Sequence, residues 1–361
     1  MAVVSVDTLL NLGYLASFVV FMVYGQRIQT SVMLVNVGRK LGQLQSLSHS
    51  AHQRLLDLIS RHHANRTDAE NALDRLTSSF MIAPVNLDPA GIVGKLEHVL
   101  DTYDDHLKTE VRKLVDGASD TEVHNLTNLL EVSISLDTIY RVVRHYYLQS
   151  KKQGGLLALA QLQMSLPAIM EEAEAYSSAV DAFAAGKAVG DGVGPLVAKK
   201  FSGESKPREL VGETDAYESS FEGRRLLIVR AKGPGGNVGK PGLAVEKLIQ
   251  EAGPIHRIIT VDAALKLEGE RSGEVAEGVG AAIGGPGAER YHIEEAATKH
   301  NIPLDAVVVK MSSKEAISVM TSEISGAVDE AAGRVRTILL AETKSGDTVI
   351  LAGIGNTIGI E

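Results

Sequence analysis

The first strong pattern along the chain is an unbroken apolar run near its N-terminus, from Thr8 to Tyr24 (TLLNLGYLASFVVFMVY). The run carries no charge, and its length is close to the minimum for a helix that crosses about 30 Å of hydrocarbon. We therefore expect residues 1–25 to form one transmembrane anchor in contact with membrane lipid. Arg27 follows the run and Asp7 precedes it. The positive-inside rule then predicts a single-pass protein with its N-terminus outside and the bulk of the chain in the cytoplasm.

Two other interpretations of this run remain open. A cleaved signal peptide usually has a basic start and a small-residue cleavage site, but the first basic residue is Arg27 and no A-x-A pattern follows Phe21. A buried core helix would need flanking sequence to cover it on all sides, and a terminal run has little. The anchor accounts best for the pattern.

From residue 26 to residue 75 the apolar positions recur mostly every three or four residues, with polar residues between them. This periodicity predicts a long amphipathic stalk helix. Its apolar stripe would either pack on the chain's own domain or join copies of the chain into a homo-oligomer. Helical patterns over 92–115, 126–148 and 156–183 then predict a helical domain that spans residues 76–185.

The pattern changes after residue 186, where short β-like runs alternate with loops and helical stretches. The segment 202–220 is polar and is expected to be a flexible linker. The β-like runs are RRLLIVRA, HRIITVDA, DAVVVKMS, RVRTILLAE and DTVILAGIG. Such alternation predicts an α/β domain over 186–361, with a mainly parallel sheet in a three-layer arrangement. Ligands in such folds bind beyond the carboxyl ends of the strands.

Composition narrows the functional classes. The chain has 36 Lys and Arg residues against 45 Asp and Glu residues, a net charge of −9, which argues against a broad nucleic-acid surface. It contains no cysteine, so disulfides, thiolate metal sites and cysteine nucleophiles are excluded.

A glycine-rich segment, AKGPGGNVGKPG, follows one expected strand and precedes a helix. Backbone N–H groups, a helix N-terminus and two lysines in one loop are suited to bind a phosphate. The segment is not a Walker A motif, because Pro234 and Pro241 replace residues which that motif requires. A glycine-rich loop with a purely structural role is the alternative. The candidate ligand-binding residues are Lys232, Gly235, Gly236, Gly239 and Lys240.

Acidic residues mark two further places. Asp262 ends an expected strand among apolar neighbours, where a carboxylate is suited to bind a divalent metal or act as a general base. His292 is a candidate to complete that metal site, although a lone histidine is more often an ordinary packing residue. Asp191 lies between glycines in GDGVGPLVAKK, where it is either functional or part of a helix start.

The chain resembles an uncharacterised archaeal membrane-anchored family, a domain of unknown function, in YGQRIQ, RVVRHYYLQSKK, GDGVGPLVAKK, ITVDAALKLEGE and GIGNTIGI. More distantly it is similar to hydrogenase-maturation endopeptidases and spore-germination proteases, which have a phosphorylase/hydrolase-like fold. In those families a strand ends in a G-x-G-N turn, an acidic D-G-x-G or D-x-x-G-P loop follows, and another strand ends in Asp-Ala.

That distant resemblance implies a metal-binding or acid–base pair formed by Asp191 and Asp262, beside a floor shaped by Gly353, Gly355 and Asn356. The order of the motifs differs, because here the G-x-G-N turn lies at the opposite end of the domain from the acidic loop. Only a circular permutation would bring them together.

The resulting hypothesis is a membrane-tethered cytoplasmic hydrolase, a peptidase with a divalent metal in its most specific form, that acts on an unknown peptide or small-molecule substrate. A nucleotide or phosphate sensor and a non-catalytic scaffold that oligomerises through its stalk are the alternatives.

Overall fold

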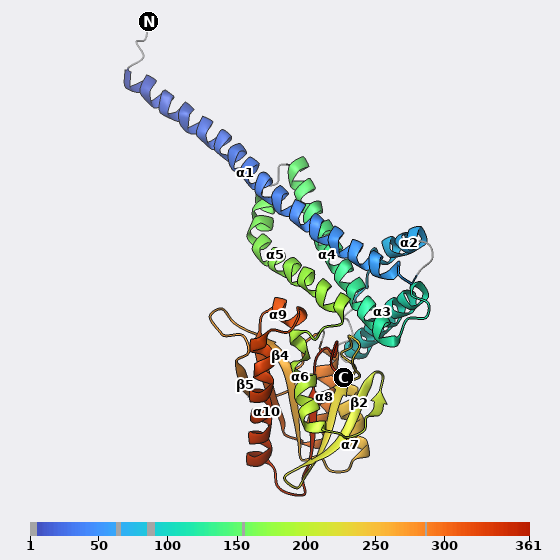
Figure 1. Ribbon diagram of the computed structural model, residues 1–361. Coiled ribbons are helices and arrows are strands. Elements are labelled where there is room, and N and C mark those ends of the chain that lie inside the picture. The colour runs from blue at the N-terminus through green and yellow to red at the C-terminus, as the bar shows by residue number, and fades with distance from the viewer. Residues whose placement is uncertain (1–5, 63–65, 85–90, 154–155, 286) are drawn as a thin grey trace. The chain divides into compact units, whose positions relative to one another are not determined.

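A computed structural model describes residues 6–62, 66–84, 91–153, 156–285 and 287–361 (Figure 1). Residues 1–5 of the expected anchor lie outside the described residues. The chain divides into two compact units. The first comprises 1–50 with 135–173, and the second comprises 51–134 with 174–361.

The N-terminal half of the chain is helical, as its periodicity predicts. Its helices are α1 Val6–Ile59, α2 Arg66–Leu76, α3 Ile92–Leu114, α4 Asp120–Gln153 and α5 Leu156–Ala185. The expected anchor and stalk are not separate elements, because α1 runs through both as one helix of 54 residues. The stalk region 26–75 also contains a second helix, since α1 ends at Ile59 and α2 begins at Arg66.

The structure contradicts the expected transmembrane anchor. None of the helices in the described residues combines the length with the apolar character that crossing a bilayer requires. The run from Thr8 to Tyr24 is shorter than the roughly 20 residues of a typical span and includes the polar residues Asn11 and Ser17. The prediction of a single-pass protein with an outside N-terminus rested on this run and is wrong with it.

The C-terminal half forms a sheet of seven strands within the described residues. The strands are β1 Arg208–Val211, β2 Thr214–Phe221, β3 Arg224–Ala231, β4 Arg257–Leu265, β5 Val275–Val279, β6 Leu304–Met311 and β7 Thr348–Gly353. They lie in the order β1-β2-β3-β7-β4-β6-β5. The pairs β3–β7, β7–β4 and β4–β6 are parallel, whereas β1–β2, β2–β3 and β6–β5 are antiparallel.

This sheet departs from the sequence prediction in three ways. It is mixed rather than mainly parallel. The expected linker 202–220 holds most of the β1–β2 hairpin, and the expected strand at 334–342 is the end of helix α10. The other four β-like runs are confirmed as strands β3, β4, β6 and β7.

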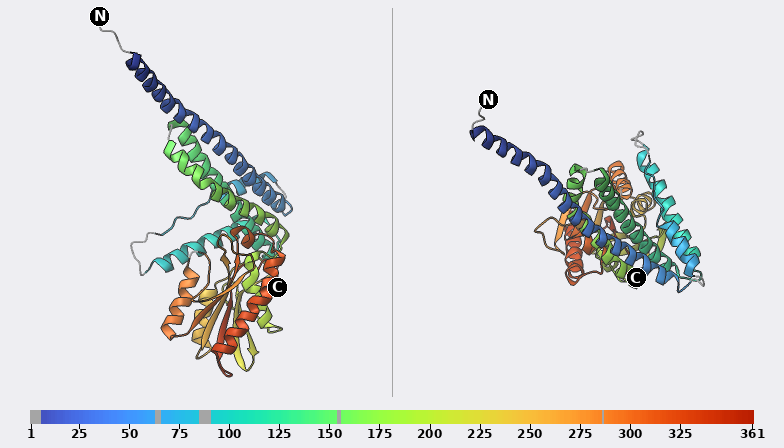
Figure 2. Two further views of the ribbon diagram at one scale, coloured as in Figure 1. Left: turned by 90° about the vertical axis from the view of Figure 1, so that its left-hand side faces the viewer. Right: turned by 90° about the horizontal axis from the view of Figure 1, so that it is seen from above.

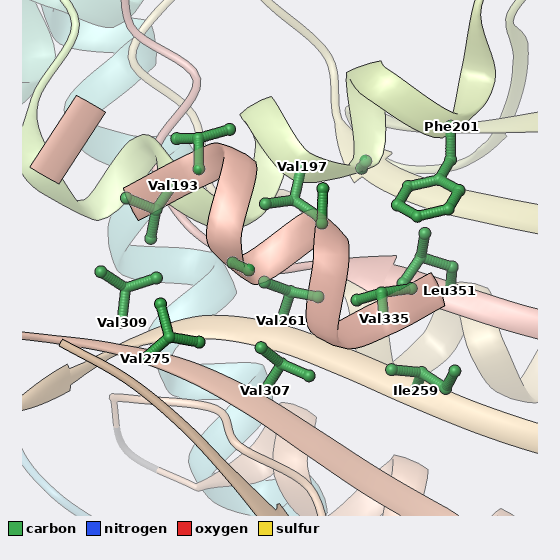
Figure 3. Packing of buried hydrophobic residues seen from close by; sticks show 14 of the residues in the cluster. Val193, Val197, Phe201, Ile259, Val261, Val275, Val307, Val309, Val335 and Leu351 are labelled. Carbon is green, nitrogen blue, oxygen red and sulfur yellow. The ribbon is translucent and has the colours of Figure 1, made fainter. Parts of the chain in front are cut away.

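Helices cover both faces of the sheet (Figures 1 and 2). Helices α6 Val193–Ser202 and α10 Ser322–Glu342 pack on one face, and α7 Pro241–Glu251 and α8 Ala288–His300 pack on the other. Figure 3 shows the first interface, where Val197 of α6 and Val335 of α10 meet Val261 of β4, all with no exposed surface. Each such side chain contributes about 1.5–3 kcal/mol on burial. The domain is therefore a three-layer sandwich.

The four central strands β3, β7, β4 and β6 run parallel, so their carboxyl ends meet at one edge of the sheet. The glycine-rich loop follows β3, the GIGNT segment follows β7, and Asp262 lies near the end of β4. A short 3₁₀ helix, η1 Gly190–Gly192, carries Asp191 just before α6.

Candidate active site

Asp262 is held by its own strand and by a distant loop. It lies on β4 opposite Val308 of β6 and is only 3% exposed. Its Oδ1 accepts a hydrogen bond from the Ala263 N–H at 2.7 Å, and its Oδ2 accepts one from the Gly284 N–H at 3.0 Å. Both carboxylate oxygens therefore have a backbone donor.

Asp191 reaches the same edge of the sheet from the N-terminal end of the domain. The Gly190 N–H donates to the Ser318 carbonyl at 3.3 Å, and Val189 forms an isolated antiparallel bridge with Val319. These contacts fix the 3₁₀ turn. The Asn356 N–H then donates to Asp191 Oδ2 at 2.8 Å, which joins the acidic loop directly to the G-x-G-N turn.

The turn and the acidic loop meet in space, as a circular permutation requires. Gly355 has φ +132°, and a Cβ on it would lie 1.9 Å from the Asp191 carbonyl oxygen. A Cβ on Gly194, in the first turn of α6, would lie 2.1 Å from the Ile354 carbonyl oxygen. The two segments touch backbone to backbone, so only glycine fits at these positions.

The two carboxyls influence each other electrostatically. Burial raises the pKa of Asp191, and the hydrogen bond from Asn356 opposes that shift. Burial also raises the pKa of Asp262 well above its usual value, and the nearby negative charge of Asp191 raises it further. Because the charge of Asp191 disfavours the ionised form of Asp262, the two carboxyls resist ionising together, and the pair tends to keep one proton.

His292, the third expected metal ligand, lies elsewhere. It is on α8, where its Nε2 is 3.1 Å from Glu97 Oε2 of α3 and its Nδ1 is 3.6 Å from Glu246 Oε2 of α7. These contacts tie three helices together. Among the residues that the structure describes, no three or more histidine, aspartate or glutamate side chains converge to hold a metal ion. The donor set predicted from the sequence is therefore not assembled.

The glycine-rich loop has internal partners for its polar groups. Lys232 Nζ lies 3.3 Å from Glu209 Oε2, and Lys240 pairs with Asp101 of α3. The remaining contacts involve the backbone of the loop: Gly236 N to Asn125 Oδ1 at 2.9 Å, Asn128 Nδ2 to Gly236 O at 2.9 Å, Gly239 N to Asn237 Oδ1 at 2.7 Å and Gly242 N to Glu289 Oε2 at 2.6 Å. A phosphate at this helix N-terminus would have to displace the Glu289 carboxylate.

The glycine-rich loop also supports the G-x-G-N turn through hydrogen bonds. The buried Thr357 Oγ1 lies within hydrogen-bond distance of the carbonyl oxygens of Lys232, Gly235 and Asn237, at 3.2, 2.9 and 3.0 Å. The Gly359 N–H donates to the Pro234 carbonyl at 3.0 Å. A Cβ on Gly235 would lie 2.8 Å from His124 Nδ1 of α4, so close packing explains this glycine.

Gly284 is the contributor to the site that the sequence did not indicate. Its segment follows β5, a strand that the pattern missed because VAEGV is short and half polar. The cluster of glycines at 278–285 was a signal for close backbone approach. Nothing in the sequence indicated that the backbone of this segment would contact Asp262.

Comparison with protein families gives two adjoining matches. Residues 12–186 match the N-terminal domain of a protein of unknown function, DUF1512, and residues 189–361 match the C-terminal domain of the same DUF1512 family. Together they cover nearly the whole chain. No curated protein matches it.

Proposed function

We propose that this chain, which belongs to the DUF1512 family, is a hydrolase that cleaves a peptide bond with the carboxyl pair Asp191 and Asp262. The observation that carries the proposal is the pairing of two carboxyls from separate parts of the domain, both with raised pKa values, at the carboxyl edge of the central parallel strands. Strongly perturbed carboxyls at such an edge are typical of acid–base catalysis.

Two carboxyls that share one proton supply both an acid and a base. The ionised carboxylate accepts a proton from a water molecule as the water oxygen attacks the carbonyl carbon of the substrate. The neutral carboxyl donates its proton to the carbonyl oxygen. When the tetrahedral intermediate collapses, the C–N bond breaks and the carboxyl that took the water proton gives it to the leaving nitrogen. The other carboxylate takes back the proton of the hydroxyl group as the C=O bond re-forms, so the pair ends with one proton, as it began.

Burial, charge and backbone donors together decide which carboxyl is the acid and which is the base. Each N–H bond to a carboxylate favours its ionised form. Asp262 accepts two such bonds and Asp191 accepts one from Asn356. At Asp262, however, burial and the negative charge of Asp191 outweigh these bonds and hold its pKa well above its usual value, so Asp262 is the better candidate for the acid and Asp191 for the base. Asp191 is also partly exposed, whereas Asp262 is buried, which lets a substrate approach from the Asp191 side.

The peptide substrate rests on the resemblance to hydrogenase-maturation and spore-germination proteases. The three motifs that carry this resemblance, DGVGP, VDA and GIGNT, meet at one place in the fold. Those families suggest a metal, but the described residues offer no set of three ligands, so the proposed steps use the carboxyls alone.

The test is hydrolysis of a mixed peptide library by the full chain and by Asp191→Asn and Asp262→Asn. Because either change removes one half of the acid–base pair, each variant should lose about 10²-fold or more of the activity. Asp329→Asn is the matched control, since Asp329 is exposed and pairs with Lys200 on the surface. The control should keep full activity.

A bell-shaped dependence of the rate on pH, with both limbs altered in Asp191→Asn and Asp262→Asn, would support the shared proton. Cleavage that survives both substitutions would disprove the role of the pair. Absence of cleavage by the wild-type chain would disprove the peptide substrate.

A further inference from the structure

We propose that α1 pairs with α1 of a second copy of this chain, as a parallel two-stranded coiled coil along residues 14–35. This inference does not depend on the proposed hydrolase. It concerns the first compact unit, to which residues 1–50 belong.

The first observation is a heptad repeat. Positions 14, 18, 21, 25, 28, 32 and 35 follow one another at strict four- and three-residue spacing. Their residues are Tyr14, Phe18, Phe21, Gly25, Ile28, Val32 and Val35. Such a seam keeps one face of a helix toward a partner helix that supercoils around it. We call these seven residues the seam; Phe18, Gly25 and Val32 occupy its a positions and the others its d positions.

The second observation is that the seam is open to solvent. Its six large side chains are 55–77% exposed: Tyr14 74%, Phe18 62%, Phe21 77%, Ile28 64%, Val32 55% and Val35 62%. Large apolar residues exposed in a continuous row mark an interaction surface rather than a surface that faces water.

The third observation is that the opposite face of α1 is already used within the unit. Val37 and Leu44, both at the f position of the same repeat, have no exposed surface. Tyr147 of α4 lies against Gly38, where an added Cβ would be 3.3 Å from the tyrosine hydroxyl oxygen. Position f lies directly opposite the a/d seam. From Val37 onward one face of α1 therefore packs within its own unit. Nearer the N-terminus side chains off the seam are exposed too, among them Leu15 at 62% and Val20 at 55%, and there the heptad spacing is what distinguishes the seam.

The open area is sufficient for a stable dimer. The three aromatic residues offer on the order of 300–500 Å² and the three aliphatic ones about 100 Å² each. About 600–800 Å² per copy, or about 1,200–1,600 Å² in total, reaches the size of a specific interface.

Charge and polarity favour a second copy as the occupant. Arg27 is the sole Lys, Arg, Asp or Glu between Thr8 and Gly38, and its c position lies outside the seam. Identical helices therefore align without burying like charges. Arg39 stands at the next a position and ends the seam. Asn11 stands at the preceding a position, where a polar residue pairs with itself only in a parallel, in-register dimer.

The test exploits the absence of native cysteine. Val32→Cys places a thiol in the seam, and Arg27→Cys places one at the outward c position of the same heptad. Under mild oxidation of the full chain, Val32→Cys should form a disulfide-linked dimer in high yield, whereas Arg27→Cys should give little. Equal cross-linking of the two variants would overturn the parallel seam.

A second measurement follows association without cross-linking. Sedimentation across a range of concentrations should show a dimer for the wild-type chain and for Arg27→Asp. Val32→Asp should raise the dissociation constant of the dimer at least tenfold and so shift the chain toward monomer. A wild-type chain that stays monomeric would overturn the proposal, as would a monomer that floats with phosphatidylcholine vesicles, because lipid would then be the occupant.

Discussion

At the scale of single residues, Asp191 and Asp262 are carboxyls whose ionised forms are disfavoured by their surroundings. Burial raises both pKa values, and the charge of Asp191 makes ionisation of Asp262 harder still. Backbone N–H donors from Ala263, Gly284 and Asn356 offset part of this cost. The site is thus held in place by the surrounding backbone rather than by its own charges.

Replacing Asp191 with Asn should stabilise the fold at alkaline pH. A carboxyl with a raised native pKa lowers stability as pH rises from its unfolded value, about 3.9, through its native value. The variant should therefore melt about 2–4 °C above wild type at pH 8 and show no advantage near pH 4. The Asn carbonyl oxygen can still accept the Asn356 hydrogen bond. Thermal melts across this range measure the effect, and a lower melting temperature at pH 8 would contradict it.

Glu213 is expected to give the opposite dependence on pH. Its hydrogen bond with His124 is the largest cause that lowers its pKa to about 2, and a bond from Lys108 adds to this. A lowered native pKa contributes stability above the unfolded value of about 4.5, which is lost as pH falls toward 2. Because the side chain is partly exposed, Glu213→Gln should cost only on the order of 1 kcal/mol at pH 7.

Chemical denaturation of Glu213→Gln at pH 7 and pH 3 measures this difference, which should shrink at the lower pH. Glu222→Gln is the control, because Glu222 has a similar left-handed backbone, with φ +48° against +54°, and an exposed side chain. An equal loss of stability in the two variants would indicate an effect of the turn rather than of the ion pair.

At the scale of elements, the carboxyl edge of the sheet depends on close backbone contacts between α6, β4 and the end of β7. A Cβ on Gly194 would lie 2.1 Å from the Ile354 oxygen and 2.4 Å from the Val261 oxygen. Neither backbone can move without disturbing the sheet.

Gly194→Ala should therefore destabilise the chain by about 1–3 kcal/mol or more and abolish any activity of the carboxyl pair. Gly326→Ala is the matched control. Gly326 lies in α10 with nothing within 4 Å of its added Cβ, so alanine should stabilise this helix by about 1 kcal/mol. Denaturant unfolding should show a lower free energy of unfolding for Gly194→Ala and a higher one for Gly326→Ala. A shift of the same sign would indicate that α6 can adapt.

The helices and strands also show which elements the sequence patterns can predict and which they cannot. Apolar runs such as RRLLIVRA and DTVILAGIG predicted buried parallel strands, because such strands are covered on both faces. The run RVRTILLAE was misassigned as a strand. Its buried residues Val335 and Ile338 continue a spacing of three and four that begins at Ile324, which is helical. The edge hairpin β1–β2 was missed because half-exposed edge strands resemble polar linkers.

The candidate site was foreseen only in part, for a physical reason. Asp191, Asp262 and the G-x-G-N turn stand out as motifs in the sequence. Whether they lie together depends on how close the two ends of the domain are in space, which the sequence does not show. Gly284 contributes only a backbone N–H. A group that any residue carries leaves no side-chain signature in the sequence, so that contact could be found only from the structure.

At the scale of the whole molecule, the two family matches and the two compact units divide the chain differently. The matches meet between residues 186 and 189, whereas the second unit includes residues 51–134 of the N-terminal match. The C-terminal domain therefore shares a unit with α2, α3 and the beginning of α4. Asn125 and Asn128 on α4 bond to the backbone of Gly236, and Lys108 on α3 pairs with Glu213.

An Asn125→Ala/Asn128→Ala double variant should loosen the glycine-rich loop. Loss of two hydrogen bonds to Gly236 leaves buried polar groups without partners, at about 1–3 kcal/mol each. Amide hydrogen exchange at residues 235–240 should become faster while exchange in β6 stays unchanged. Gln161→Ala, on the exposed surface of α5, is the control. Unchanged protection in the loop would show that the C-terminal domain holds it without the helices.

The position of β7 affects how the protein is made. This strand lies between β3 and β4, yet it is the last of the seven to emerge during synthesis. Until residues 348–353 leave the ribosome, β3 and β4 each present an unpaired apolar edge, which is the state most prone to aggregation. The sheet cannot be completed co-translationally from its N-terminal strands. A nascent chain stalled before Thr348 should therefore depend on chaperones, and release of that segment should close the sheet and assemble the carboxyl pair in one step.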